Sequence, residues 1–346
     1  MNMKAQIKPK VYKLDKLADV IPLDAPYGIS ISIGNACDFK CVYCVSAMND
    51  TKAGHLKHMS LEEFKLIAEQ IAQFEKPIRQ VSFISQGETI LNQSLPDMVK
   101  MLKDRGLANR VKVLTNANRL TPELSDKLIA AGLDVLRISL QGITAENYLK
   151  ICRTKIDFEA FVNQIRYFYE HRGSCNLHVK IIDIALDEGQ EALFYDIFGN
   201  ISDYIFIEKC TGAYQEYLGK DNNGLNRFLH NLSNIRICPQ PFYFMKIDHN
   251  GNVLPCCQVN ANIDDGKFVI TNCITSGKNL KQIWDVNFRP LQYELLQGDI
   301  SEEHMCFACE RFAEIEKEEN ILDNDRNEIL ARYADYMPRS IQFFKR

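Results

Sequence analysis

The sequence predicts an α/β protein with a partial (β/α)6 barrel of the TIM type, followed by a small C-terminal β-hairpin and a helical, cysteine-containing extension. Two observations predict this fold. Short β-rich runs alternate with helical runs six times between residues 28 and 208, which indicates a parallel sheet with right-handed crossovers. After residue 210, two apolar runs flank an Asn-Gly turn, and charged helical segments follow. Six repeats suit a partial barrel better than the full eight-stranded one. A flat doubly wound sheet has the same periodicity, so the periodicity alone does not decide between the two.

The predicted strands are nearly continuous runs of apolar or β-branched residues, as expected for strands that are covered on both faces. They are residues 29–33, 80–84, 111–115, 135–140, 178–184 and 204–207. The helices between them have recognisable starts. Ser60 and Glu63 form a capping box before the helix at 64–74. Thr121 precedes a proline at a first helical position, and Thr144 is a candidate cap after the fourth strand.

The hairpin is predicted at residues 242–254, around the turn at 248–251. The chain is therefore divided into five parts. These are an N-terminal extension at 1–27, the barrel at 28–210, a connector at 211–236, a cysteine-containing domain at 237–315 and a helical tail at 316–346.

The composition is that of an ordinary globular protein, with 46% hydrophobic and 25% charged residues in 346. The net charge of −4 gives no electrostatic case for binding nucleic acid or an anionic membrane. No apolar stretch approaches the roughly 18 residues of a membrane span, and no signal peptide is visible. We therefore expect a cytoplasmic protein without a membrane partner. In that compartment, twelve cysteines point to metal rather than to disulfides.

The most informative feature is the run of Cys37, Cys41 and Cys44 directly after the first strand. This C-x3-C-x2-C spacing supplies three thiolates, whereas an iron–sulfur cluster normally has four. A vacant position keeps a metal site open to a small molecule. The alternatives are a set of reduced buried thiols or a structural zinc site. The zinc site needs a fourth ligand, and none lies close in sequence.

With Tyr43 just before the last cysteine, this triad resembles the signature of the radical S-adenosylmethionine (SAM) superfamily. The resemblance covers roughly residues 28–210. It implies that the cysteines hold a [4Fe-4S] cluster whose open iron binds the amino and carboxylate groups of SAM. It also implies reductive cleavage of SAM to a 5′-deoxyadenosyl radical, with flavodoxin or ferredoxin as the electron donor.

The resemblance assigns further cofactor-binding residues at the ends of later strands. Gly87 and Glu88 match the family's Gly-Gly-Glu motif, with Gln86 in place of the first glycine, and are expected to bind the SAM amino group. Each is also compatible with a simple strand-end turn.

Three more polar residues are carried over in the same way. Asn116 is expected near SAM or the substrate, and Ser139 is expected to bind the ribose. Arg153 is expected to pair with the SAM carboxylate, for which a guanidinium is well suited. The alternative for each residue is a strand-end cap or a surface side chain.

A second group of cysteines resembles the SPASM/Twitch extension of radical SAM enzymes. We assign Cys238, Cys256, Cys306 and Cys309 to one auxiliary [4Fe-4S] cluster, with Cys257 as an alternative to its neighbour. A four-cysteine zinc ribbon has similar spacing and is the rival interpretation.

The remaining thiols divide into two groups. Cys210, Cys257 and Cys273 are candidate hydrogen-atom donors to a substrate radical, as a radical epimerase requires, although each is also compatible with a small buried hydrophobe. Cys152 and Cys175 are interpreted as structural.

We expect oxidation (dehydrogenation) or epimerisation of a sugar or aminocyclitol. The 27 residues before the first strand are too few for a leader-binding domain, which favours a small, hydroxyl-rich substrate. A peptide-modifying maturase, either an epimerase or a crosslinking enzyme, is the alternative. A non-catalytic iron–sulfur electron carrier is an alternative of another class. The sequence leaves open the substrate, the choice among these reactions and the oligomeric state.

Overall fold

The computed structural model describes residues 3–7, 15–44, 47, 56–208, 235–256, 268–298, 306 and 320–334. The described residues form one ten-stranded sheet in the order β1-β7-β6-β5-β4-β3-β2-β8-β9-β10. All six predicted strands are present, each parallel to its neighbours. They are β2 (Gly28–Ile31), β3 (Gln80–Phe83), β4 (Val111–Thr115), β5 (Val135–Leu140), β6 (Asn176–Ile182) and β7 (Tyr204–Glu208).

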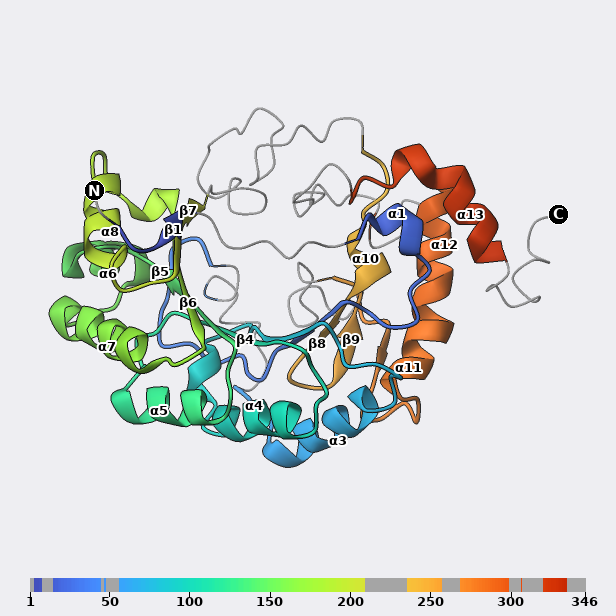
Figure 1. The fold of residues 1–346 in the computed structure, drawn as a ribbon, viewed down its shortest axis with the longest axis horizontal. Coiled ribbons are helices and arrows are strands. Elements are labelled where there is room, and N and C mark those ends of the chain that lie inside the picture. The colour runs from blue at the N-terminus through green and yellow to red at the C-terminus, as the bar shows by residue number, and fades with distance from the viewer. Residues whose placement is uncertain are drawn as a thin grey trace.

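The sheet curves into an arc, and helices cover its convex face (Figure 1). The sheet does not close, because β1 and β10 are its two edges. This arrangement confirms the partial barrel. The helices of the convex layer are α3 (Leu61–Ile71), α4 (Leu95–Asp104), α5 (Pro122–Ala130), α6 (Ala145–Cys152), α7 (Phe158–His171) and α8 (Glu191–Phe198).

The predicted helix starts are confirmed. The Ser60 hydroxyl accepts a hydrogen bond from the Glu63 backbone N–H at 3.1 Å, and the Glu63 carboxylate accepts one from the Ser60 N–H at 2.8 Å. The helix spans Leu61–Ile71, so it starts and ends three residues earlier than predicted. Thr121 and Thr144 cap α5 and α6.

The predicted hairpin is also present, but it continues the barrel sheet. β8 (Phe244–Ile247) pairs antiparallel with β9 (Asn252–Leu254) and parallel with β2. The first two residues of the predicted 242–247 run belong instead to α10 (Gln240–Tyr243). A third strand, β10 (Thr271–Asn272), follows β9.

The N-terminal segment contains a strand that the sequence did not predict. β1 (Gln6–Ile7) pairs parallel with β7 at the other edge of the sheet. Two residues are too few to show the alternation of apolar and polar side chains that predicts a strand. This strand can therefore be recognised only from its pairing with β7.

The two faces of the sheet differ in polarity. The Phe64 ring on α3 lies 5.5 Å from the Phe83 ring, so Phe83 faces the helices. The alternation of a strand then places Ser82 on the concave face, in register with Ser30 and Lys112. The same alternation and register place Arg137, Ser139, Lys180, Glu208 and Lys246 on that face. The strands are thus apolar mainly toward the helices, contrary to the expectation of two apolar faces.

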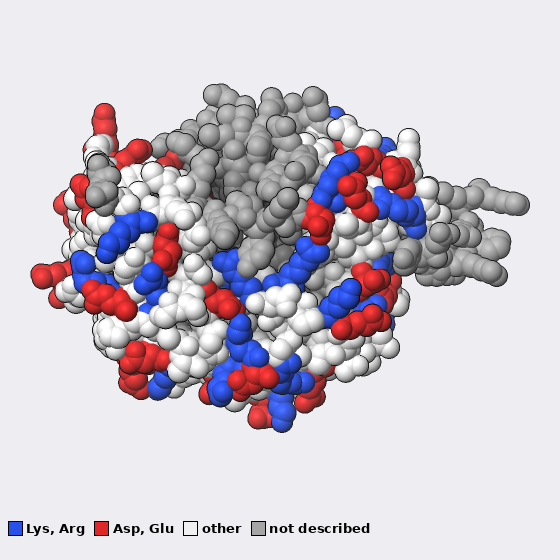
Figure 2. Space-filling model, viewed as in Figure 1, with Lys and Arg blue, Asp and Glu red and all other residues white. Residues whose placement is uncertain are grey.

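The C-terminal helices pack onto the N-terminal segment. They are α11 (Leu280–Ile283), a π-helical turn (Trp284–Phe288), α12 (Arg289–Gln297) and α13 (Arg326–Ala334). The buried Trp284 and Arg289 side chains donate to the Leu23 carbonyl at 2.8 and 2.5 Å. Acidic and basic side chains are interspersed over the face in Figure 2. Of the helices in the described ranges, none combines the length and apolar character needed to cross a bilayer.

Candidate metal centre

The cysteine loop follows β2 at the C-terminal edge of the sheet. Two of its aromatic residues, Phe39 and Tyr43, are only 3% and 8% exposed and anchor the loop. Cys37 is exposed, and Cys41 and Cys44 are half-buried. The apolar side chains therefore hold the loop, while its thiols lie closer to the surface.

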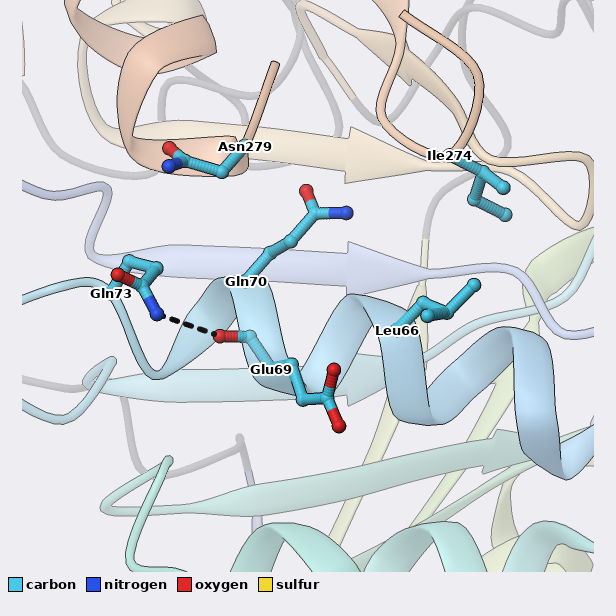
Figure 3. Close-up of a pocket in the computed structure, with 6 residues that line it drawn as sticks. All are labelled: Leu66, Glu69, Gln70, Gln73, Ile274 and Asn279. Carbon is cyan, nitrogen blue, oxygen red and sulfur yellow. Dashed lines mark hydrogen bonds between the residues drawn. The ribbon is translucent and has the colours of Figure 1, made fainter. Parts of the chain in front are cut away.

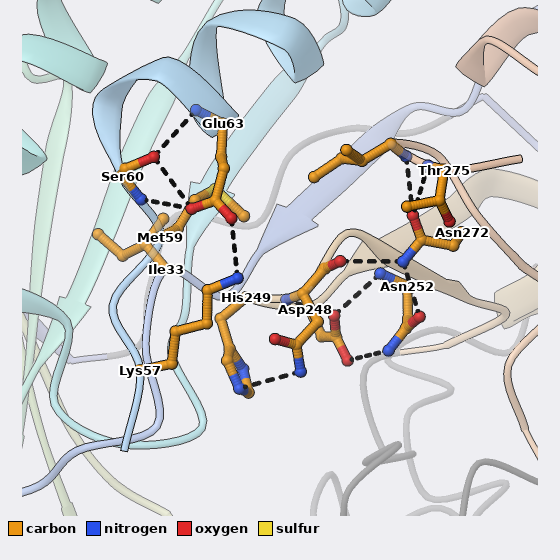
Figure 4. A network of polar contacts seen from close by, with 12 residues as sticks. Ile33, Lys57, Met59, Ser60, Glu63, Asp248, His249, Asn252, Asn272 and Thr275 are labelled. Atoms are coloured by element: carbon orange, nitrogen blue, oxygen red, sulfur yellow. Dashed lines mark hydrogen bonds and ion pairs between the residues drawn. The ribbon is translucent and has the colours of Figure 1, made fainter. Parts of the chain in front are cut away.

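The first residues of the loop pair with the segment before α3. The Met59 N–H donates to the Ile33 carbonyl at 2.9 Å, and the Asn35 side chain accepts from the Lys57 N–H at 2.8 Å. The buried Asn92 amide donates to the carbonyls of Ile33 and Met59 at 3.0 and 2.8 Å. Lys57 of this segment forms an ion pair with the Glu63 carboxylate in the first turn of α3, at 2.8 Å (Figure 4). The start of the loop is thereby tied to α3.

Gly87 allows the end of β3 to touch the cysteine loop. The Glu88 N–H donates to the Ala36 carbonyl at 2.7 Å. A Cβ atom on Gly87 would lie 2.0 Å from the Ala36 oxygen. Only glycine fits at position 87, because Ala36 packs directly against it. Ala36 is the residue before Cys37, so this contact joins the end of β3 to the cysteine loop.

The Glu88 carboxylate joins the ends of β3 and β4. It is 4% exposed and accepts hydrogen bonds from the Thr115 hydroxyl at 2.5 Å and the Asn116 N–H at 2.6 Å. A third bond comes from the Ile90 N–H at 3.0 Å. Burial raises the pKa of Glu88 to about 7, although these hydrogen bonds oppose the shift.

This raised pKa predicts a pH-dependent stability. The folded protein holds a proton on Glu88 that the unfolded chain, at 4.5, releases, so this contribution is complete below about pH 4.5 and is lost as the pH rises through 7. The loss amounts to roughly 3 kcal/mol. Thermal unfolding from pH 5 to 8 should therefore show a smaller decline in Glu88→Gln than in the wild type. Equal declines in the two proteins would contradict the assignment.

Asp38 ties the cysteine loop to the residues after β4, and sequence reasoning missed it. Its carboxylate accepts from the Asn116 and Asn118 amides at 3.0 and 2.7 Å, and from Arg119 Nε at 3.2 Å. Its partners lie about eighty positions further along the chain, so no local pattern signals them.

The other predicted cofactor-binding residues surround this edge of the sheet. Asn116 is 8% exposed, and its amide is engaged with Asp38. Ser139 is half-buried on the concave face of β5. Arg153 is exposed in a left-handed conformation (φ 56°) at the end of α6. The next residue, Thr154, donates to the Asp38 carbonyl at 3.4 Å, so Arg153 lies beside the cysteine loop.

Only part of the predicted auxiliary cluster lies within the described residues. Cys238, Cys256 and Cys306 are half-buried, and Cys257 and Cys309 lie outside the described residues.

A buried polar network shapes the turn that leads toward Cys256. The fully buried Asp248 accepts from the Asn252 N–H at 2.9 Å and the Asn252 amide at 3.0 Å. Asn272 of β10 donates to the Asn252 side chain at 3.0 Å (Figure 4). These bonds connect the three antiparallel segments of the hairpin region.

Of the candidate hydrogen-atom donors, Cys273 is described, and Cys210 and Cys257 are not. The Cys273 N–H donates to the Gly251 carbonyl at 2.8 Å, and its carbonyl accepts from the Gln70 amide at 2.8 Å. Burial raises the pKa of Cys273 to about 12, which keeps the thiol in the S–H form that a donor needs. Through these two backbone hydrogen bonds, Cys273 is held between α3, which carries Gln70, and the hairpin turn, which carries Gly251.

Known protein families match both the barrel region and the C-terminal cysteine region of this chain. A family model described as the radical SAM superfamily matches residues 31–193, and one for an iron–sulfur cluster-binding (SPASM) domain matches residues 238–310. A probable GTP 3′,8-cyclase of Methanococcus maripaludis is 32% identical over 284 residues, which are 73% of this chain and 90% of that protein. This chain belongs to the radical SAM superfamily.

Other relatives match in part. An AdoMet-dependent heme synthase of Methanosarcina barkeri is 32% identical over 126 residues, 36% of this chain. The match covers 34% of the length of the heme synthase. Two solved structures share the fold. SuiB of Streptococcus suis, bound to a precursor peptide, has a TM-score of 0.54 at 14% identity, covering 80% of this chain and 69% of that one. The enzyme anSMEcpe has a TM-score of 0.55 at 13% identity, covering 91% and 98%.

The radical SAM family uses [4Fe-4S] clusters and SAM, and the residues of this loop fit such a group. Three cysteines lie on one anchored loop, and Gly87 lets the end of β3 pack directly against that loop. Among the described residues, no three Cys, His, Asp or Glu side chains are already gathered as ligands. A cysteine binds a metal as the thiolate, so metal binding must release the thiol protons.

A small pocket lies away from these residues. It has a volume of about 290 Å³ and lies between α3 and the segment at 274–279 (Figure 3). Its lining residues are Leu66, Glu69, Gln70, Gln73, Ile274 and Asn279. None of the predicted site residues is among them, although Gln70 donates to the carbonyl of Cys273, one of the candidate hydrogen-atom donors.

Proposed function

We propose that this radical SAM protein oxidises or epimerises a small, polar, hydroxyl-rich substrate such as a sugar or aminocyclitol. Cys37, Cys41 and Cys44 would hold the [4Fe-4S] cluster that binds SAM. When bound, these groups supply reductive cleavage of SAM and a 5′-deoxyadenosyl radical for hydrogen-atom abstraction. Gly87 lets the end of β3 pack on the loop, and the Asp38 carboxylate fixes the loop against the end of β4.

The polar concave face carries the substrate assignment. At its C-terminal edge, Lys180 of β6 forms an ion pair with Glu208 of β7, and Ser139 lies in register with Lys180. Hydrogen-bonding and charged groups at this edge favour a hydrophilic substrate, since an apolar one would displace solvent from them without offering hydrogen bonds in return. Two residues before Ser139 on β5, the Arg137 guanidinium lies over the Phe206 ring, 5.2 Å from its centroid.

The test is SAM turnover by anaerobically reconstituted, reduced protein with a panel of sugars, aminocyclitols, GTP and peptides. GTP is included because a relative that the chain covers for 90% of its length is named as a probable GTP cyclase. Sugar-dependent formation of 5′-deoxyadenosine supports the proposal. Deuterium from solvent should appear at the product carbon in an epimerisation and not in a dehydrogenation. Turnover confined to GTP or to peptides would contradict the proposed substrate class.

A peptide-modifying function is the second candidate. It is favoured by the fold shared with SuiB and anSMEcpe, which were solved with a precursor peptide and with a peptide, respectively. A peptide that gains or loses two hydrogens, or inverts a centre, on incubation with the protein and SAM would establish it.

A non-catalytic electron carrier is the alternative of another class. It predicts that iron-loaded, reduced protein releases no 5′-deoxyadenosine from SAM under any substrate condition. A zinc protein, in contrast, would be colourless and contain no iron.

The auxiliary site has its own prediction. We expect a Cys306→Ala, Cys309→Ala double variant to lose about half of the iron, because one of two four-iron clusters would be lost. The visible absorbance should fall in parallel, and some SAM cleavage uncoupled from product should remain. Retention of all the iron in the double variant would show that these cysteines are not ligands.

A further inference from the structure

A thiol from outside the cysteine loop lies against it. Cys152 is the last residue of α6 and is completely buried. Its Sγ lies 3.7 Å from the Sγ of Cys41, although 111 positions separate the two residues. This distance suits a hydrogen bond between sulfurs, because a thiol is both a weak donor and a weak acceptor.

Backbone hydrogen bonds on both sides of Cys41 join the loop to the end of α6. The Lys40 N–H donates to the Cys152 carbonyl at 3.0 Å, and the Val42 N–H donates to the Ile151 carbonyl at 2.9 Å. The Thr154 hydroxyl lies 3.1 Å from the same Cys152 carbonyl. With both flanking residues of Cys41 tied to the end of α6, the backbones that carry the two thiols are held side by side.

Cys152 belongs to the hydrophobic core, and Cys41 packs against that core. Tyr148 of α6 is fully buried, and its ring lies 5.7 Å from the Phe39 ring of the loop and 5.4 Å from the Phe161 ring. A hydrogen bond to a charged sulfur is stronger in such surroundings than in water. An S–H donor next to Cys41 is therefore placed where its effect on that sulfur is large.

We propose that Cys152 is a positioning residue of the radical SAM cluster, whose thiol donates its S–H to the Cys41 sulfur once that sulfur is an iron ligand. This inference rests on the proposed function, because it takes Cys41 as a ligand. Hydrogen bonds to cluster sulfurs help to set the reduction potential. They stabilise the more negatively charged, reduced state most, so the Cys152 donor raises the potential at which the cluster accepts its electron.

The test compares Cys152→Ala with Cys152→Ser in the reconstituted holoenzyme, since these variants differ by one hydroxyl donor. The cluster is identified as the one whose electron paramagnetic resonance signal changes on adding SAM, and its potential is measured by redox titration. We expect full iron in both variants, a more negative potential in Cys152→Ala, and a return toward the wild-type value in Cys152→Ser. Cys175→Ala removes a buried thiol elsewhere and should leave the potential unchanged.

Two results would overturn the inference. One is the same potential in Cys152→Ala and the wild type. The other is loss of iron in Cys152→Ala but not in Cys175→Ala, which would make Cys152 a ligand rather than a donor. Failure of the metal centre that the proposed function requires is distinguishable, because Cys37→Ala would then keep its full iron, whatever Cys152 does.

A measurement on the wild-type chain remains informative if Cys152→Ala does not fold. After removal of iron with a chelator, diamide should oxidise Cys41 and Cys152 to a disulfide. The two thiols lose two protons and two electrons, and diamide takes them up as the hydrazine. Mass spectrometry of the digest would reveal the linked peptide. Linkage of Cys41 only to Cys37 or Cys44 would overturn the contact.

Discussion

Cys37→Ala is expected to reduce SAM cleavage to the level of a protein-free control and to remove the SAM-binding cluster. Two thiolates would remain for a cluster that the proposed site holds with three. Because Cys37 is exposed, its removal costs little packing, so the loss should be chemical rather than structural. Iron content, visible absorbance and 5′-deoxyadenosine formation measure the effect.

Cys175→Ala is the matched control for this prediction. Cys175 is a buried thiol just before β6, and nothing assigns it to a metal. This variant should keep its iron and its SAM cleavage. A Cys37→Ala protein with full iron and turnover would contradict the assignment of the loop as the metal centre.

Gly87→Ala is expected to have the second largest effect. The added Cβ would lie 2.0 Å from the Ala36 oxygen, so the end of β3 or the cysteine loop has to move. Forcing an extra methyl group into a packed site costs about 1–3 kcal/mol, which corresponds to a loss of roughly 5- to 150-fold in the population of the native loop arrangement. Cluster occupancy and the apparent affinity for SAM should fall together.

The control for Gly87→Ala is Gly173→Ala. Gly173 has a left-handed φ of 56°, and no atom lies within 4 Å of an added Cβ. The substitution should cost about 1 kcal/mol of backbone strain and leave the cluster intact. If both variants load iron equally well, the close contact at Gly87 does not control the metal centre.

Most of the barrel could be predicted from the sequence because its signals are local. Each of the six strands is a short β-rich run, and the caps at Ser60, Thr121 and Thr144 act within three residues. The C-x3-C-x2-C spacing is equally local, as is the Asn-Gly turn of the hairpin. The boundaries were less certain, since helix α3 ends at Ile71 rather than at residue 74.

The sequence by itself determined the fold class, the superfamily and the loop expected to hold the metal. The tertiary structure decided how that loop is held. Glu88 joins the ends of β3 and β4, Asp38 joins the loop to residues about eighty positions away, and Cys152 reaches Cys41 across 111 positions. It also decided that β8 extends the barrel beside β2. The reason is physical: periodicity and spacing report neighbours along the chain, whereas these contacts exist only after the parallel strands bring their C-terminal ends to one edge.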